Sequence, residues 1–322
     1  MIITITINPA VDKSTTVEKM IPEKKLRCSD LLIEAGGGGI NVSKAIKKLG
    51  GESLALFPSG GANGKQLEQI LLRDNINYKS IPIDAETRES FTASELSTNA
   101  QYRFVMPGSK LSAEEIELCL SAINSLKPLP SIIVASGSLP PGVPDDFFAR
   151  LAVMSKQKGI KLIVDTSGTP LRLAAQQGVY LLKPNLSELG SLVGTGYLQL
   201  DEVDDAALEV IEKGHCEIVV VSMGPSGAML ITKESYEMVS APTVKKLSTV
   251  GAGDSMVAGM AWMLEQGKSL SEVVRFGVAC GTAATMNSGT QLFKPEDVYR
   301  LYDWINNKKP IKAVAVQSKS SL

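Results

Sequence analysis

The chain has 322 residues, of which 44% are hydrophobic and 21% are charged, and its formal net charge is −1. These values are typical of a globular protein with an extensive core, and they exclude a general basic field for nucleic acid or an anionic membrane. His215 is the only histidine, which excludes Ser–His–Asp catalysis and multi-histidine metal sites. The four cysteines form no CxxC pair, which argues against structural zinc and a disulfide scaffold. We recognise no targeting or membrane-spanning segment and expect a cytoplasmic protein.

The first hundred residues predict short elements punctuated by glycine. Ile2–Ile7 has the alternation of a strand, and Leu54–Phe57 is a short apolar run that ends in a turn. Between them, Asn41–Leu49 has the apolar spacing of a helix.

Two segments in this part do not fit an alternation of strands and helices. Thr92–Leu96 and Gln101–Val105 flank a polar turn and predict a hairpin. We expect residues 12–35 and 86–106 to form a small β-sheet that projects from the main domain as a lid.

From about residue 130 onward, short strands of the buried type alternate with helices. This alternation predicts an α/β fold with a central, mostly parallel sheet covered by helices on both faces. We expect a single domain over residues 1–307 and a loose polar tail over 308–322. The strands are predicted at Ile132–Ala135, Lys161–Val164, Val179–Leu182 and Ile218–Val221, and the closing helices at Ser255–Glu265, Ser271–Met286 and Pro295–Ile305.

The segment from Thr249 to Gly259, TVGAGDSMVAG, carries the strongest chemical signal. Gly251 and Gly253 let the backbone turn tightly into a helix, so that amide groups around Ala252 point outward and bind anionic oxygen. Asp254 then lies where it accepts a proton from an attacking hydroxyl group while the amides hold a transferring phosphoryl group. Taken alone, the segment also fits an aspartate that caps a helix after a glycine turn.

Two other phosphate-binding motifs are excluded. Gly60–Lys65 is similar to a Walker A loop, but Ser59 occupies the first glycine position and Gln66 follows the lysine. The glycines before Asp254 do not continue into the dinucleotide-binding pattern, because residue 256 is Met.

Polar residues near the first strand and its following glycines are candidates for sugar binding. Gly36–Gly39 precede a helix and allow a ligand close to the backbone, and Asn41 either binds sugar hydroxyl groups or caps the helix. Asp12 follows the first strand, at the sheet edge where ligands bind, and its carboxylate suits two adjacent hydroxyl groups. A simple turn aspartate is the alternative.

Two segments after later strands are candidates for nucleotide binding. Asn185 and Glu188, three residues apart at a helix start, either present oxygen atoms to the magnesium of ATP or form a capping pair. Ser222–Gly227 closes another strand with two glycines and suits either nucleotide contact or a hairpin turn.

Basic residues accompany the predicted lid. Arg88 and Arg103 lie on its strands, with Lys25 and Arg27 nearby in the sequence. Guanidinium groups bind phosphate bidentately, and a solvated charged surface is the alternative.

The Gly36–Asn41 and Ser248–Met256 segments together resemble the two signatures of the PfkB group of ribokinase-like carbohydrate kinases, and the resemblance extends over residues 1–307. The resemblance implies that Asp254 is the catalytic base and that Gly251, Ala252 and Gly253 form an anion hole. It implies contacts with a sugar phosphate from Asp12, Gly38, Gly39, Asn41, Arg88, Arg103 and Ser136. It places ATP at Lys25, Lys183, Asn185, Ser222, Gly224 and Gly227, with Mg²⁺ held through water by Asn185 and Glu188.

Many members of this group also hold a monovalent cation such as K⁺ beside the anion hole. The matching positions are Ser248, Val250, Ala284, Asn287, Gly289 and Gln291, of which Gln291 replaces the arginine expected in bacterial relatives. A homodimer joined through lid strands is expected, because exposed strand edges need cover.

The resemblance also implies a substrate. Lys25–Cys28 and Gln101–Gly108 resemble the fructose-6-phosphate kinases of the group. The implied reaction is ATP-dependent phosphorylation of fructose 6-phosphate at its C1 hydroxyl, a glycolytic step. Kinases of tagatose 6-phosphate or fructose 1-phosphate are the alternatives within the family. A catalytically silent sugar-phosphate sensor and a dehydrogenase are the alternatives outside it, and the intact Asp254 counts against the sensor.

Overall fold

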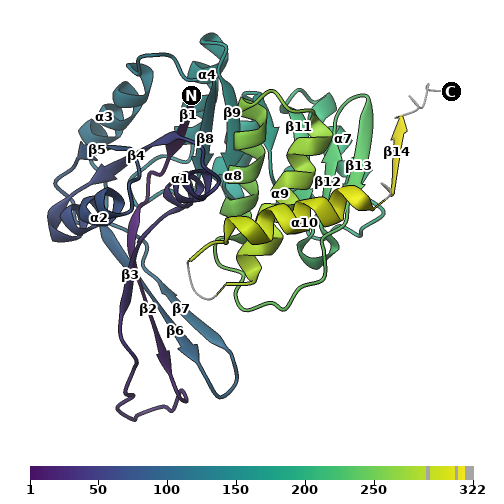
Figure 1. Cartoon of the computed structure of the whole chain (residues 1–322). Coiled ribbons are helices and arrows are strands. Elements are labelled where there is room, and N and C mark those ends of the chain that lie inside the picture. Colours follow the sequence, from purple (N-terminus) through teal and green to yellow (C-terminus); the bar gives the residue numbers. More distant parts are fainter. Residues whose placement is uncertain (288–290, 309–310, 316–322) are drawn as a thin grey trace.

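The computed structural model describes residues 1–287, 291–308 and 311–315, which form two β-sheets (Figure 1). The large sheet has ten strands in the order β14-β13-β12-β11-β10-β9-β8-β1-β4-β5. The seven strands from β11 to β5 in this spatial order pair in parallel with one another. At the other edge, β12, β13 and β14 add antiparallel strands. The bounds are β1 (Ile2–Ile5), β4 (Ser53–Ser59), β5 (Tyr78–Pro82), β8 (Ile132–Ser136), β9 (Lys161–Asp165), β10 (Val179–Leu182), β11 (Cys216–Ser222), β12 (Ala228–Ile231), β13 (Ser235–Val239) and β14 (Ile311–Ala315).

Helices cover both faces of this sheet, because successive residues of each buried strand point to opposite sides. Ile3 and Ile5 of β1 belong to one apolar core, and Ile2 belongs to the core on the other face. The first core includes residues of α3, α4, α5, α6 and α7, and the second includes residues of α1, α8, α9 and α10. The expected α/β fold is therefore confirmed. The bounds are α1 (Gly38–Lys48), α2 (Gly61–Arg73), α3 (Ala113–Asn124), α4 (Phe147–Gln157), α5 (Gly168–Gln176), α6 (Leu186–Val193), α7 (Val203–Glu212), α8 (Ala252–Glu265), α9 (Leu270–Thr285) and α10 (Pro295–Asn307).

The small sheet has the strand order β3-β2-β6-β7 and projects from the main body as a lid (Figure 1). Its strands lie within or at the margins of the two segments that were expected to form it. They are β2 (Ala10–Val17), β3 (Leu32–Gly36), β6 (Arg88–Glu95) and β7 (Gln101–Val105). A third apolar core fixes the root of the lid, where Val11 and Ala35 are buried with Ile40, Phe57 and Leu67 of the main domain.

The segment after Lys308 differs from our expectation of a loose tail. Ile311–Ala315 forms β14 and pairs antiparallel with β13. The edge of β13 offers backbone N–H and C=O groups to any extended segment within reach, so the pairing depends on the sheet and is not visible in the composition of the tail. Residues 309–310 and 316–322 lie outside the described part of the chain.

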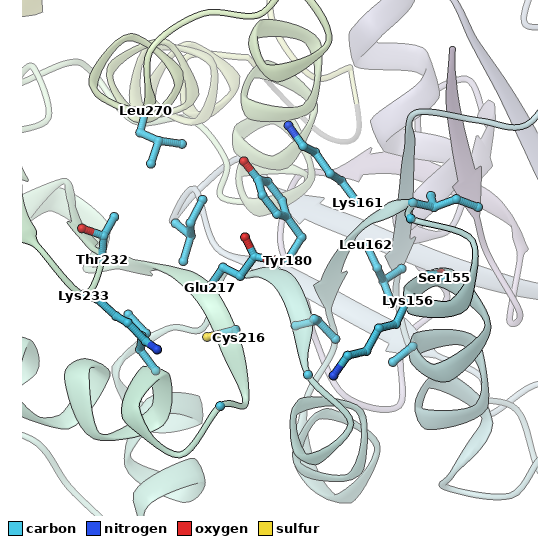
Figure 2. A pocket seen from close by; sticks show the side chains of 18 of the residues that line it. Ser155, Lys156, Lys161, Leu162, Tyr180, Cys216, Glu217, Thr232, Lys233 and Leu270 are labelled. Carbon is cyan, nitrogen blue, oxygen red and sulfur yellow. The ribbon is translucent and has the colours of Figure 1, made fainter.

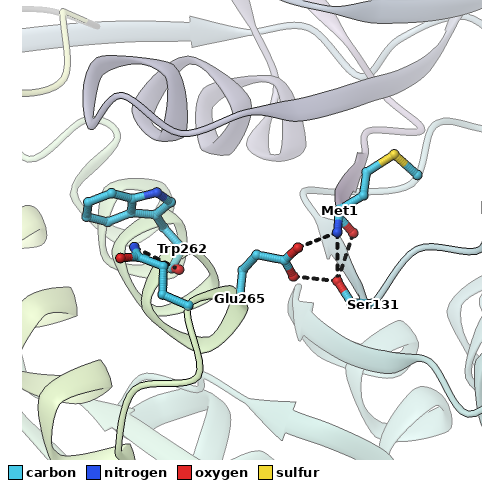
Figure 3. Close-up of polar contacts among 5 residues, drawn as sticks. Met1, Ser131, Trp262 and Glu265 are labelled. Atoms are coloured by element: carbon cyan, nitrogen blue, oxygen red, sulfur yellow. Dashed lines mark hydrogen bonds and ion pairs between the residues drawn. The ribbon is translucent and has the colours of Figure 1, made fainter.

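The far end of α8 is tied to the start of the sheet (Figure 3). The Met1 amine contacts Glu265 at the last turn of α8 and donates to Ser131 Oγ over 3.0 Å, and Ser131 in turn donates to Glu265. The Ser131 backbone N–H also donates to the Met1 carbonyl over 3.1 Å. These contacts fix α8 against the starts of β1 and β8. None of the helices in the described ranges is long and apolar enough to cross a membrane.

Candidate active site

Polar side chains gather at the carboxyl ends of the parallel strands, where ligands bind in open α/β sheets. Ser136 ends β8, Asp165 ends β9, and Lys183 follows β10 directly. The amino-terminal turn of α8 faces them, since the Ser136 hydroxyl lies 3.4 Å from Oδ1 of Asp254.

Asp254 is held by side chains from other elements. Asn41 of α1 donates from Nδ2 to Oδ2 of Asp254 over 2.9 Å. The pKa of Asp254 is raised from 3.8 to about 6, chiefly by burial and then by the nearby Asp165 charge, while Asn41, Lys183 and Ser136 act to lower it. Such a carboxylate is ionised at neutral pH and accepts a proton more readily than an exposed aspartate.

The glycine turn before Asp254 forms the expected anion-binding geometry. Gly251 has a φ of 73° and is the N-cap of α8 without a capping side chain, so the alternative that Asp254 caps this helix is wrong. The Ala252 N–H donates to the Thr249 carbonyl over a long 3.3 Å. The N–H groups of Gly253 and Asp254 donate to no acceptor among the described residues, and they stand at the positive end of the helix dipole.

A buried ion pair adds positive charge to this turn. Lys183 is 6% exposed, and its Nζ lies 3.2 Å from Oδ1 of Asp165. A Cβ placed on Gly253 would lie 3.7 Å from the same Nζ, which puts the ammonium group beside the anion hole. Burial alone would lower the pKa of Lys183, but the Asp165 carboxylate raises it, so the lysine stays charged. The sequence interpretation missed Asp165, although its place at the end of a buried strand is the signal that had identified Asp12.

A cavity of about 620 Å³ borders the glycine turn at Ala252 and Gly253. Of the residues expected to bind ATP, it is lined by Asn185, Ser222, Gly224 and Gly227, together with Ala252 and Gly253 of the anion hole. Its remaining walls come from the loop after β13 and from α8 and α9, which carry no nucleotide motif and were missed. They include Pro242, Val244, Met256, Val278 and Thr285.

Asn185 and Glu188 form the capping pair that was the alternative to a magnesium site. Asn185 Oδ1 accepts from the Glu188 N–H over 2.9 Å, and Glu188 Oε2 accepts from the Asn185 N–H over 2.8 Å. Burial and the neighbouring Asp165 raise the pKa of Glu188. The described residues contain no cluster of three or more His, Cys, Asp or Glu that could hold a metal. Both side chains are oxygen donors that already accept backbone N–H bonds, so they suit a magnesium ion held through water and not one bound directly.

Gly38, Gly39, Asn41 and Ser136 lie around Asp254 and the end of β1. Asp12 lies within β2 of the lid, so its predicted place directly after the first strand, and the alternative of a turn aspartate, are both wrong. A Cβ on Gly38 would lie 2.3 Å from the Ser136 hydroxyl, and one on Gly39 would lie 2.6 Å from the Ile5 carbonyl, so the close approach of α1 to β1 and β8 requires glycine. Asn41 Oδ1 is buried and accepts no hydrogen bond from the described residues. It is therefore an acceptor available to a substrate hydroxyl group.

The two arginines of the lid differ in their contacts. Arg88 donates to the Met106 carbonyl over 2.7 Å and to the Asn8 carbonyl over 3.0 Å, so part of its guanidinium group ties β6 to the ends of β7 and β1. Arg103 is exposed on β7, and both arginines act to lower the pKa of Asp12. Lys25 is exposed in the loop between β2 and β3.

Of the positions expected to hold a monovalent cation, Ser248, Val250, Ala284 and Asn287 lie at the end of α9 and in the turn before α8. The N–H groups of Leu247 and Ser248 donate to the Thr285 carbonyl, at 2.8 and 3.3 Å, which brings Ser248 and Val250 close to Ala284 and Asn287. Gln291 is exposed. Gly289 lies outside the described residues.

A larger cavity, of about 760 Å³, lies at the amino ends of the parallel strands, around the starts of β9, β10 and β11 (Figure 2). Lys156, Lys161 and Lys233 line it together with Glu217, and no predicted site residue does. The carboxyl end of α4 lies here, and lysines at such ends complement the helix dipole. This cavity is therefore separate from the candidate active site.

The pattern of the pfkB family of carbohydrate kinases matches residues 2–297. The chain belongs to this family. It is 42% identical over 306 residues to the ATP-dependent 6-phosphofructokinase isozyme 2 of Escherichia coli, covering 95% of this chain and 99% of that protein. It is 43% identical over 302 residues to the enzyme of the same name from Mycobacterium tuberculosis, covering 94% and 89%. It is 33% identical over 298 residues to the 1-phosphofructokinase of Bacillus subtilis, covering 91% and 96%.

Solved structures of pfkB kinases have the same architecture. The E. coli phosphofructokinase-2 in complex with substrates and products has a TM-score of 0.90 at 41% identity, covering 95% of this chain and 99% of that chain. The same enzyme in complex with potassium has a TM-score of 0.91 at 42% identity with the same coverage. Its tetrameric inhibited form has a TM-score of 0.90 at 40% identity, again with that coverage. The ribokinase-like fold expected from the sequence is thereby confirmed.

Proposed function

We propose that this protein transfers the γ-phosphoryl group of ATP to the C1 hydroxyl group of fructose 6-phosphate and so produces fructose 1,6-bisphosphate and ADP. The observation that carries the proposal is the position of Asp254. Its carboxylate stands beside two unbonded backbone N–H groups, between the 620 Å³ cavity and the sugar-binding candidates on α1 and β8. Similarity to two 6-phosphofructokinases supports the choice of acceptor.

The proposed mechanism uses Asp254 as general base. The carboxylate takes the C1 hydroxyl proton as that oxygen forms a bond to the γ-phosphorus, while the bond from phosphorus to the departing ADP oxygen breaks. The free N–H groups of Gly253 and Asp254 and the ammonium group of Lys183 stabilise the charge on the moving phosphoryl group. Asp165 keeps Lys183 charged and in place.

Magnesium and potassium are proposed as the cations of this site. Asn185 and Glu188 would hold magnesium through water molecules at the cavity wall, where the ion would neutralise phosphate charge. Ser248, Val250, Ala284, Asn287 and Gln291 are the described positions proposed for potassium, and the potassium complex of the E. coli relative supports this assignment.

The choice of hexose phosphate is testable by direct comparison. Fructose 6-phosphate, tagatose 6-phosphate and fructose 1-phosphate are each mixed with the protein and Mg-ATP, and ADP release is followed. We expect the highest kcat/KM with fructose 6-phosphate. A higher value with fructose 1-phosphate would instead favour the function named for the B. subtilis relative. ADP release with none of the three would contradict the proposal for this sugar class.

We also propose that the protein is a homodimer joined through the lid and that it acts in the cytoplasm, where its four free cysteines stay reduced. Large apolar side chains are exposed on or beside the edge strands β3 and β7, which supports a covered lid. They are Leu31, Leu32, Phe104, Val105 and Met106. We expect light scattering at micromolar concentration to give the mass of a dimer without ATP. A monomeric mass would contradict this part of the proposal. A tetrameric mass would show a further association of dimers, as in the tetrameric inhibited form of the E. coli relative.

A further inference from the structure

Lys44 is a buried lysine at the root of the lid that no sequence motif singled out. It lies on α1 one turn after Asn41 and is 7% exposed. Its Nζ donates to the Ala35 carbonyl over 3.0 Å and lies 3.7 Å from Oε1 of Glu34. Both partners belong to β3, so Lys44 ties an edge strand of the lid to a helix of the main domain.

Two carboxylates meet beside this lysine. Asp12 of β2 and Glu34 of β3 are directly opposite each other in an antiparallel pair, so their side chains share one face of the lid. The Asp12 carboxylate rests over the next part of β3, because a Cβ on Gly36 would lie 2.1 Å from its Oδ2. Carboxylates that face each other in a partly buried place repel unless a cation offsets them.

Three cations act on the Asp12 carboxylate. Burial raises the pKa of Asp12, and Glu34 raises it further. Lys44 is the strongest influence that lowers it, ahead of Arg88 and Arg103. Arg88 is engaged with backbone carbonyls and Arg103 is exposed, whereas Lys44 is buried against the strand that pairs with β2.

We propose that Lys44 is a positioning residue for the sugar phosphate, which holds β3 against α1 and supplies the buried positive charge that keeps the Asp12 carboxylate in place for the acceptor. The inference rests on the proposed function, in which Asp12 binds acceptor hydroxyl groups. Helix α1 then makes two positioning contacts one turn apart, since Asn41 holds the base Asp254 and Lys44 holds the strand next to Asp12. The helix thereby sets the spacing between base and acceptor.

The experiment compares Lys44→Met, which removes the charge at similar length, with Lys44→Arg, which retains it. Steady-state kinetics give kcat and both KM values over a range of pH, and calorimetry gives the affinity for fructose 6-phosphate without ATP. We expect Lys44→Met to weaken fructose 6-phosphate binding by about tenfold or more, because the Asp12 carboxylate and β3 lose the buried cation beside them, while kcat and the KM for ATP stay within about twofold. Because loss of the cation raises the pKa of Asp12, KM for the sugar phosphate should begin to rise at a higher pH on acidification than in the wild type.

Three controls keep this result interpretable. Lys47→Met removes an exposed charge from the same helix and should match the wild type. Lys44→Arg should restore most of the affinity. The double variant Glu34→Gln/Lys44→Met removes both charges of the ion pair. Its affinity for fructose 6-phosphate should lie between that of Lys44→Met and that of the wild type. If Lys44→Met alone does not fold, this double variant is the test.

Two results would overturn the role of Lys44. One is an unchanged affinity and pH profile in Lys44→Met. The other is a parallel loss of kcat and both affinities that Lys44→Arg does not restore, since that indicates a structural role alone. A wild-type protein that turns over no hexose phosphate contradicts the proposed function instead.

Discussion

Asn41 donates a hydrogen bond to Asp254 over 2.9 Å, although 213 residues separate the two along the chain. The bond joins the two glycine-rich motifs, because Asn41 lies at the start of α1 and Asp254 at the start of α8. It uses the amide nitrogen of Asn41 and leaves the buried Oδ1 without a donor among the described residues. The same side chain is thus able to orient the base and to receive a substrate hydroxyl group.

Replacing Asn41 by Ala should shift the pH dependence of catalysis. The Asn41 hydrogen bond lowers the pKa of Asp254, so its loss raises that pKa above the wild-type value of about 6. The acid limb of the kcat/KM profile should therefore move to higher pH. In addition, kcat/KM at neutral pH should fall by about tenfold to a hundredfold, because the variant makes no hydrogen bond from this position to Asp254 or to the substrate. The profile is measured with saturating Mg-ATP, with Lys47→Ala as the exposed control on the same helix. An unmoved acid limb would show that Asn41 does not act on the base.

Replacing Asp254 by Asn should stabilise the fold at neutral and alkaline pH. The folded pKa of about 6 lies above the unfolded value of 3.8, so protonated Asp254 contributes stability that is full below 3.8 and is lost as pH rises through about 6. The amide that replaces the carboxylate stays neutral at every pH, so the variant does not lose this stability. Urea unfolding should therefore give Asp254→Asn a higher free energy of unfolding than the wild type above pH 6, with the difference fading in acid. A less stable variant at neutral pH would contradict the burial of this charge.

The two glycines of the anion hole should respond differently to alanine. Gly251 has a φ of 73°, and a Cβ there would come within 2.6 Å of Leu292, so Gly251→Ala should cost about 1–2 kcal/mol or more in unfolding free energy. A Cβ on Gly253 meets only the Lys183 ammonium group at 3.7 Å, an ordinary contact inside a helix. Gly253→Ala should therefore match or exceed the wild type in thermal unfolding. Equal losses in both variants would contradict the geometry of the turn.

The sequence predicted the architecture and the two motifs because both depend on local signals. Strand and helix alternation indicated the parallel sheet, and glycines before a helix indicated the Asp254 and Asn41 turns. The bond between those two residues was not predictable from spacing, since it depends on how α1 and α8 pack on one face of the sheet.

The missed residues have their partners in other elements. Lys44 has the appearance of an ordinary helix lysine until β3 is placed over it, and Asp165 becomes important only when Lys183 arrives from the next strand. The strand Ile311–Ala315 likewise needs the edge of β13. Long-range packing, which composition and periodicity do not encode, decided each of these.

The most direct test of the central claim is the turnover of Asp254→Asn with fructose 6-phosphate and Mg-ATP, measured as ADP release beside the wild type. The account predicts that kcat falls by about 10²- to 10⁴-fold while both substrates still bind, because the amide accepts no proton from the C1 hydroxyl group. Turnover close to that of the wild type would contradict the assignment of Asp254 as the base.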